Sequence, residues 1–154
     1  MTHEVVVQTV DELIALGERI GARLAGGETI ELVGDIGAGK TTLTKGLARG
    51  MGIAEEVQSP TFTLSRVYDA PNGRRLAHYD FYRLNNAGIM QAELAEVVQD
   101  ARTVTVIEWA AVVGDVLPDD TLRITICVQA DDTRRLELEA GGKCSKHIVQ
   151  ELMK

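Results

Sequence analysis

Gly34-Asp35-Ile36-Gly37-Ala38-Gly39-Lys40-Thr41 is the stretch that decides the fold. It matches the phosphate-binding pattern G-x-x-x-x-G-K-[ST] at every fixed position. Residues 28–33 before it alternate polar and apolar and predict a strand, whereas in 42–51 after it large apolar side chains recur every four residues, as on one face of a helix. A strand, a glycine-rich loop and a helix in this order distinguish a P-loop from a chance match.

The residue types of this loop suit the binding of phosphate. Gly34, Gly37 and Gly39 allow backbone angles that other residues avoid, so that successive N–H groups can point at phosphate oxygens. The helix that begins there adds its positive N-terminal end. We expect Lys40 to reach the β- and γ-phosphates and the Thr41 hydroxyl to hold Mg²⁺. The alternative is a glycine-rich turn with a surface lysine, but the flanking elements favour a nucleoside triphosphate site.

Length and charge limit the possible functions. A chain of 154 residues with 45% hydrophobic residues predicts one domain, 1–154, with a single core. No apolar run approaches the roughly 20 residues that span a bilayer. The formal net charge is −7, and the basic pairs at 74–75 and 134–135 are isolated. Because nucleic-acid binders usually carry a basic stripe, we expect any RNA to be contacted mainly through a partner.

The cysteines and histidines give no sign of a metal centre. Cys127 and Cys144 form no C-x-x-C pair and are typical of free thiols in a reducing compartment. His3, His78 and His147 have no ligand-like spacing and are interpreted as surface or strand histidines. The chain opens without the basic segment of a secretory signal. We therefore expect a cytoplasmic protein.

The remaining elements alternate along the chain. Strands are expected at 5–9, 28–33, 63–68, 75–80, 103–107, 122–128 and 134–140, and helices at 42–51, 86–101 and 144–153. Asp11 is a candidate N-cap for a further helix that ends at Gly26-Gly27. Turn residues at 69–73 predict a hairpin between two of the strands. The fold class predicted is α/β of the P-loop NTPase type, a mostly parallel central sheet flanked by helices with an antiparallel hairpin addition.

Two positions beyond the P-loop are candidates for the same site. Thr61 lies in Ser59-Pro60-Thr61-Phe62, where a switch loop could present a hydroxyl to Mg²⁺ and the γ-phosphate; an ordinary turn threonine is the alternative. Glu108 ends the β-branched run 103–107, where a Walker B carboxylate would lie, unless it simply points into solvent. Trp109 follows it and belongs either to the core or to the lining of the site.

Four blocks together resemble the signature of the TsaE family, formerly called YjeE, the bacterial ATPases of tRNA threonylcarbamoyladenosine biosynthesis. They are Gly-Asp-Ile-Gly-Ala-Gly-Lys-Thr-Thr (34–42), Ser-Pro-Thr-Phe (59–62), His-Tyr-Asp-Phe-Tyr-Arg-Leu (78–84) and Ile-Glu-Trp (107–109). The resemblance covers nearly the whole chain. It implies hydrolysis of ATP with Mg²⁺ in the cycle by which TsaB and TsaD install threonylcarbamoyl on adenosine 37 of ANN-decoding tRNAs.

The resemblance also implies roles for particular residues. It implies that phosphate is held by Gly37, Ala38, Gly39, Lys40, Thr41 and Thr42. Thr41 would also hold Mg²⁺, and Thr61 would belong to a switch-like segment. Asp80 and Glu108 would be the acidic pair near the metal and the hydrolytic water, with their division of labour left open, and with Lys40 they make up the expected catalytic set. Trp109 would lie beside the nucleotide, and Arg134 and Asp11 are further candidate contacts.

The resemblance also bears on partners. In the family the nucleotide lies at the interface with the TsaB–TsaD pair. We therefore expect a monomer that binds this pair, contacts tRNA only through it and has no membrane association.

Two other functions are compatible with a P-loop. A small-molecule kinase would need an arginine-bearing lid, for which Arg74-Arg75 is the candidate. A GTP-dependent regulatory protein of the Ras type would need an Asn/Thr-Lys-x-Asp strand end, which the sequence does not contain.

Overall fold

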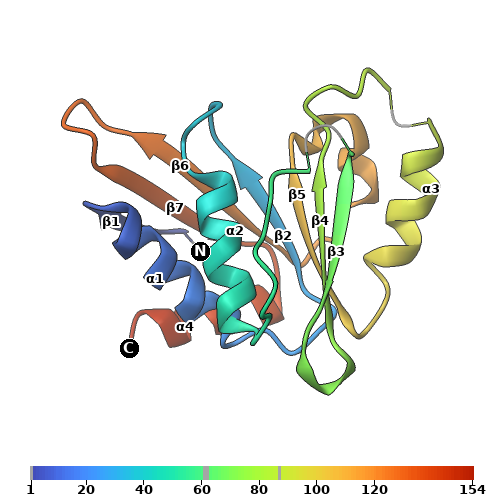
Figure 1. The fold of residues 1–154 in the computed structure, drawn as a ribbon, viewed down its shortest axis with the longest axis horizontal. Helices are drawn as coiled ribbons and strands as arrows, with labels where there is room; N and C mark the ends of the chain where they lie inside the picture. The colour runs from blue at the N-terminus through green and yellow to red at the C-terminus, as the bar shows by residue number, and fades with distance from the viewer. Residues whose placement is uncertain (1, 61–62, 87) are drawn as a thin grey trace.

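A computed structural model describes residues 2–60, 63–86 and 88–154, and within them seven strands form one sheet flanked by helices (Figure 1). The strands are β1 (Thr2–Val7), β2 (Thr29–Val33), β3 (Ser65–Asp69), β4 (Arg75–Asp80), β5 (Thr103–Glu108), β6 (Thr121–Val128) and β7 (Arg134–Ala140). The α-helices are α1 (Val10–Gly21), α2 (Lys40–Gly50), α3 (Gly88–Val97) and α4 (Lys143–Leu152), and the 3-10 segments are η1 (Pro71–Gly73) and η2 (Ala110–Val116).

The order of the strands is β1-β7-β6-β2-β5-β4-β3. The four central strands β6, β2, β5 and β4 are parallel, β7 and β1 continue the sheet antiparallel on one side, and β3 pairs antiparallel with β4 at the other edge. The predicted α/β fold and its antiparallel hairpin are therefore confirmed. Because β2, β4 and β5 run in the same direction, the residues at their carboxyl ends meet at one edge of the sheet.

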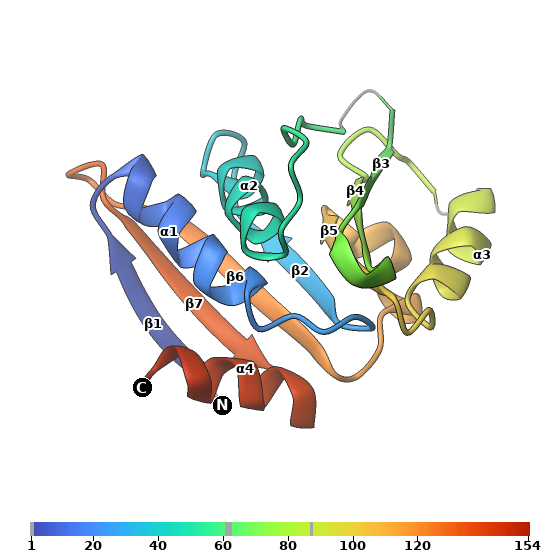
Figure 2. The same ribbon diagram turned by 60° about the horizontal axis from the view of Figure 1, so that its bottom comes forward.

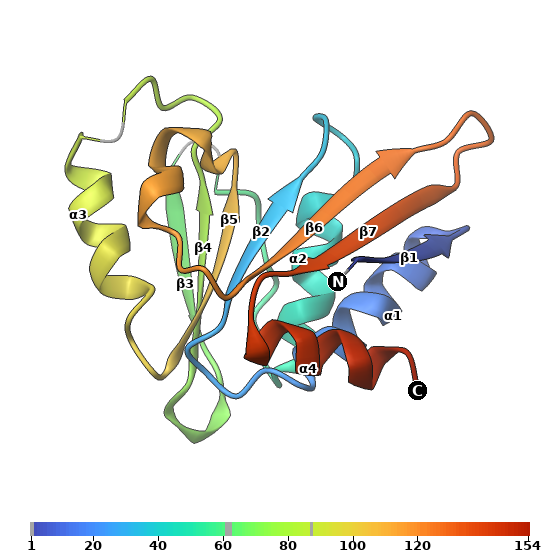
Figure 3. The ribbon, with the colours of Figure 1, turned by 180° about the vertical axis from the view of Figure 1, so that it is seen from behind.

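Helices cover the two faces of the sheet unequally. The α1 and α2 helices lie across one face (Figure 2), while η2 and α3 cover the β4–β5 part of the other (Figure 3). Along β5, Val104 and Val106 belong to the core under α2, whereas Ile107 belongs to the core under α3. By strand alternation Glu108 continues the row of Val104 and Val106, so it faces the α2 side. No helix of the described residues is long and apolar enough to span a bilayer.

The start and end of α1 differ from the prediction. The N-cap is Thr9, whose hydroxyl accepts a hydrogen bond from the N–H of Glu12 at 3.1 Å, so the prediction of Asp11 as the cap was wrong. A cap needs extended backbone angles, which Thr9 has, whereas Asp11 already lies in the first helical turn. The helix also ends at Gly21, before Gly26-Gly27, which both have positive φ.

The α1 and α2 helices cross with their backbones in close contact. Gly17 and Gly21 of α1 face Gly46 and Gly50 of α2, and a Cβ added at Gly46 would lie 2.3 Å from the carbonyl oxygen of Ile14. No side chain fits between the two helices at these points. Since α2 begins at Lys40, this crossing fixes the helix whose N-terminus completes the loop that is predicted to bind phosphate.

We expect Gly46→Ala to lower the free energy of unfolding by about 1–3 kcal/mol, because the added methyl must push the helices apart. The better helix propensity of alanine, worth about 1 kcal/mol, offsets only part of this. Urea unfolding followed by circular dichroism measures the change. The control is Gly114→Ala in η2, where an added Cβ meets nothing within 4 Å. Equal stability of the two variants would contradict the tight crossing.

Candidate functional site

The loop between β2 and α2 has the shape expected of an anion cradle. Gly37 and Gly39 have φ values of 83° and 118°, a region that favours glycine, and Gly39 directly precedes α2. Gly34 lies outside that region, so the prediction that it needs special backbone angles was wrong. Glycine is needed at position 34 because the backbone of Ile126 lies so close that an added Cβ would be 2.9 Å from its carbonyl oxygen.

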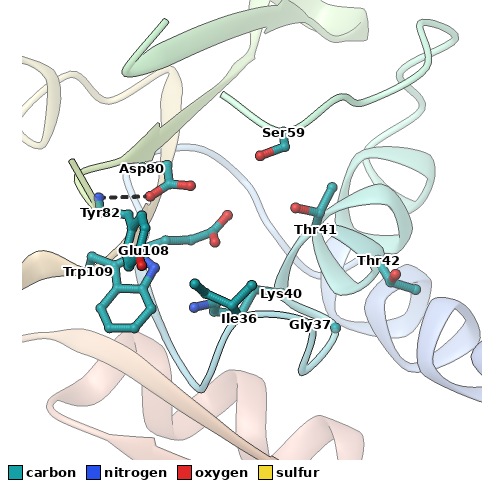
Figure 4. A pocket seen from close by; sticks show the side chains of 11 residues that line it. Ile36, Gly37, Lys40, Thr41, Thr42, Ser59, Asp80, Tyr82, Glu108 and Trp109 are labelled. Atoms are coloured by element: carbon teal, nitrogen blue, oxygen red, sulfur yellow. Dashed lines mark hydrogen bonds between the residues drawn. The ribbon is translucent and has the colours of Figure 1, made fainter. Parts of the chain in front are cut away.

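A cavity of about 370 Å³ opens beside this loop at the carboxyl ends of β4 and β5 (Figure 4). It is lined by Ile36, Gly37, Gly39, Lys40, Thr41, Thr42, Ser59, Asp80, Tyr82, Glu108 and Trp109. Eight of the predicted site residues are thus brought together from three segments of the chain. Ile36, Ser59 and Tyr82 were not predicted to line the site, although each lies inside or next to a block that was.

The two candidate carboxylates lie side by side. Asp80 and Glu108 are register partners on the parallel strands β4 and β5, and both are nearly fully buried. With 3% of Glu108 exposed, the alternative that it points into solvent is excluded. The Tyr82 N–H donates to Asp80 Oδ1 at 3.0 Å, and His78 Nε2 lies 2.6 Å from Glu108 Oε2. In each carboxylate, a contact to one of its oxygens therefore fixes the group at the edge of the cavity.

His78 is a contact that the sequence analysis missed. It is a strand histidine, as expected, but it is fully buried and reaches a predicted site residue. A signal was present in the sequence, because His78 and Asp80 are two residues apart in one strand and so share a face.

Lys40 and Trp109 contact each other across the mouth of the cavity. Lys40 Nζ donates to the carbonyl oxygen of Gly34 at 2.6 Å and lies 4.1 Å from the centre of the Trp109 ring. Burial lowers the pKa of Lys40, although the nearby carboxylates, Glu108 foremost, act to raise it. Trp109 has a φ of 57°, an unusual backbone angle for a tryptophan, and its ring lies 5.0 Å from that of Tyr82.

Of the other predicted residues that the structure describes, Ala38, Arg134 and Asp11 lie outside the lining of the cavity. Arg134 supports the loop from behind, since its Nε donates to the carbonyl oxygen of Ala38 at 3.0 Å and its Nη1 to that of Asp132 at 2.8 Å. Asp11 is exposed in the first turn of α1. Thr61 lies outside the described residues. For Arg134, Asp11 and Thr61, contact with a ligand stays a prediction.

The oxygen atoms around the cavity suit Mg²⁺ bound together with a polyphosphate. Thr41, Asp80 and Glu108 offer one hydroxyl and two carboxylates to the same space. Within residues 2–60, 63–86 and 88–154, no group of three or more His, Cys, Asp or Glu side chains could hold a metal by itself. Mg²⁺ usually takes one or two carboxylates, keeps several waters and completes its shell with substrate phosphates. The donor set fits that pattern.

Comparisons with known proteins agree on one family. The profile described as "Threonylcarbamoyl adenosine biosynthesis protein TsaE" matches residues 7–136. The tRNA threonylcarbamoyladenosine biosynthesis protein TsaE of Bacillus subtilis is 35% identical, with 92% of this chain and 88% of that protein aligned. The protein of the same name from Streptomyces coelicolor is 39% identical over 77% of this chain and 80% of its own length. The crystal structure of B. subtilis YdiB superposes with a TM-score of 0.81 at 30% identity, covering 99% of this chain and 95% of YdiB.

We expect Arg134→Met to speed amide hydrogen exchange in the loop 36–39 by about tenfold or more, because a hydrogen bond from a charged donor contributes about 1.5–3 kcal/mol. Exchange followed by mass spectrometry measures it on the protein without ligand. The matched control is Arg135→Met at the neighbouring position. Arg135 pairs with Glu4, its Nη1 lying 3.6 Å from Glu4 Oε1, and not with the loop. Unchanged exchange in the Arg134 variant would contradict the supporting role.

Proposed function

The chain belongs to the TsaE family of tRNA threonylcarbamoyladenosine biosynthesis proteins, and from this premise we propose that it is a Mg²⁺-dependent ATPase. In this proposal it works with TsaB and TsaD in forming threonylcarbamoyladenosine at position 37 of tRNAs that read ANN codons, in the cytoplasm. The observation that carries the proposal is the arrangement around one cavity. A glycine loop, Lys40 and Thr41 form one wall, and the register-matched pair Asp80 and Glu108 forms the facing wall.

The reaction needs an oriented water and neutralised charge more than covalent chemistry. The water oxygen attacks the γ-phosphorus, the bond between that phosphorus and the β–γ bridging oxygen breaks, and ADP and inorganic phosphate are released with the water proton taken up by a nearby oxygen base. Lys40 and the loop N–H groups stabilise the phosphate oxygens. Asp80 and Glu108 would hold Mg²⁺, directly or through water, and orient the attacking water. Mg²⁺, when bound, supplies charge neutralisation at the β- and γ-phosphates.

The exposed rim of the site supports the part of the proposal that involves a partner. Ile36 is 69% exposed and Tyr82 is 48% exposed, yet both line the mouth of a cavity whose inner groups are charged. A partner that covers this rim would exclude water and strengthen every electrostatic contact inside. In this proposal TsaB–TsaD is that partner. A chain with a formal net charge of −7 would then reach tRNA only through it.

The kinase alternative is less well supported. Arg74 donates to the carbonyl oxygens of Leu24 at 2.7 Å and Met51 at 3.0 Å, and Arg75 pairs with Asp100 at 3.1 Å. Both arginines lie at the β3–β4 turn, at the end of the sheet opposite to the P-loop (Figure 1). They are therefore poorly placed to close over a phosphate as a lid.

The alternative of a GTP-dependent protein is tested by a competition titration of ATP against GTP, in which tighter binding of GTP would contradict the choice of ATP.

We expect Lys40→Ala and Glu108→Gln each to lower ATP hydrolysis in the presence of TsaB–TsaD by about 100-fold or more, since positioned charges and bases contribute on this scale. Glu108→Gln should still bind ATP, because the loop and Lys40 remain. Phosphate release and nucleotide binding are measured in parallel. Glu96→Gln, the same chemical change on the exposed side of α3, is the control.

Hydrolysis by Glu108→Gln at the wild-type rate would remove Glu108 from the mechanism. The appearance of a phosphorylated metabolite in place of free phosphate would overturn the proposed function and favour a kinase.

A further inference from the structure

His78 is a buried histidine without a role in the mechanism described so far. Its side chain is completely buried, and its Nε2 lies 2.6 Å from Oε2 of Glu108, which is 4% exposed at its side chain. Its other ring nitrogen, Nδ1, is also buried and has no hydrogen-bond partner among the described residues. We propose that His78 is a positioning residue: its Nε2 lies within hydrogen-bond distance of Glu108 Oε2 and fixes that carboxylate so that its second oxygen faces the reacting water.

The surroundings of the ring determine where its proton lies. An ionised carboxylate only accepts hydrogen bonds, so the short contact requires a proton on Nε2. A proton on Nδ1 would be buried without an acceptor, at a cost of about 1–3 kcal/mol. A ring that donates through Nε2 to Glu108 therefore uses the one nitrogen that has a hydrogen-bond partner.

The register of the sheet makes this contact possible. On the parallel strands β4 and β5, His78 lies opposite Val106 and Asp80 lies opposite Glu108. His78 is therefore one pleat further from the cavity, on the same face, directly behind the Glu108 carboxylate. A glutamate has three side-chain torsions, and a donor behind it removes most of that freedom. Asp80, which is shorter, is held instead by the backbone N–H of Tyr82.

This inference rests on the proposed function, because it assigns the orientation of the nucleophile to Glu108. The Glu108 Oε2 is engaged by His78, which leaves Oε1 for the water that attacks phosphorus. In this role His78 acts by holding the Glu108 carboxylate in place. Loss of the donor should therefore lower kcat and leave the binding of ATP, which depends on the loop and Lys40, nearly unchanged.

Two substitutions separate this role from simple packing. The side-chain amide nitrogen of His78→Gln reaches the position of Nε2 and can still donate to Glu108, whereas that of His78→Asn reaches only the position of Nδ1. We expect His78→Asn to lower kcat by about 10–100-fold, the usual effect of losing such a supporting contact. His78→Gln should stay within about threefold of the wild type, and KM for ATP should change little in both.

The control is Thr105→Val, which should leave kcat unchanged. It alters a buried polar group on β5 that faces the α3 side of the sheet, away from Glu108.

A double variant tests whether His78 acts through Glu108. In a Glu108→Gln background, His78→Asn should have no further effect on kcat. A wild-type kcat for His78→Asn would overturn the proposal. So would an equal fall for both substitutions with a matching rise in KM, because that pattern indicates packing alone.

A measurement on the wild-type protein tests the same point without any activity. Long-range ¹H–¹⁵N NMR of the three histidines, with His3→Gln and His147→Gln for assignment, reports the protonated nitrogen of each ring. We expect the Nε2 of His78 to carry the proton that is donated to Glu108. A ring with its proton on Nδ1 and none on Nε2 would overturn the inference. An absence of ATP hydrolysis in the wild type with TsaB–TsaD would overturn the proposed function, while the tautomer result would still stand.

Discussion

The parallel alignment of β2, β5 and β4 is the constraint on which the rest of the structure depends. Parallel strands end at the same edge, so the loop after β2 and the last residues of β4 and β5 share one side of the sheet. The pairing of Asp80 with Glu108 then follows from register alone. The helix dipole of α2 and the loop N–H groups face these carboxylates across a cavity that a polyphosphate and a divalent cation would suit.

Support for this edge comes from elements that do not line the cavity. The α1 helix holds α2 through paired glycines, and it does so at the backbone, where no rotamer change can absorb movement. The β6–β7 hairpin brings Arg134 against the carbonyl oxygen of Ala38. The loop is thus held by the helix behind it and by the strands beside it.

The fold and most of the candidate site could be predicted because their signals are local. A fixed motif located the loop, alternation located the strands, and a β-branched run ending in Glu108 located the acidic edge. The sequence places His78 on the same strand face as Asp80, but the contact of His78 with Glu108 and that of Arg134 with Ala38 depend on which strands become neighbours. The glycines of α1 and α2 gave no signal either, since their spacing has meaning only once the two helices cross. Asp11 failed as a cap because Thr9 competes for the same role two residues earlier.

The resting place of Lys40 has an energetic consequence. Its ammonium group already has two partners inside the protein, the carbonyl oxygen of Gly34 and the face of Trp109. In the proposed function, a phosphate would have to displace these two partners before Lys40 could contact it. The apparent affinity for nucleotide would then be the intrinsic affinity multiplied by the fraction of molecules whose lysine is free of both partners.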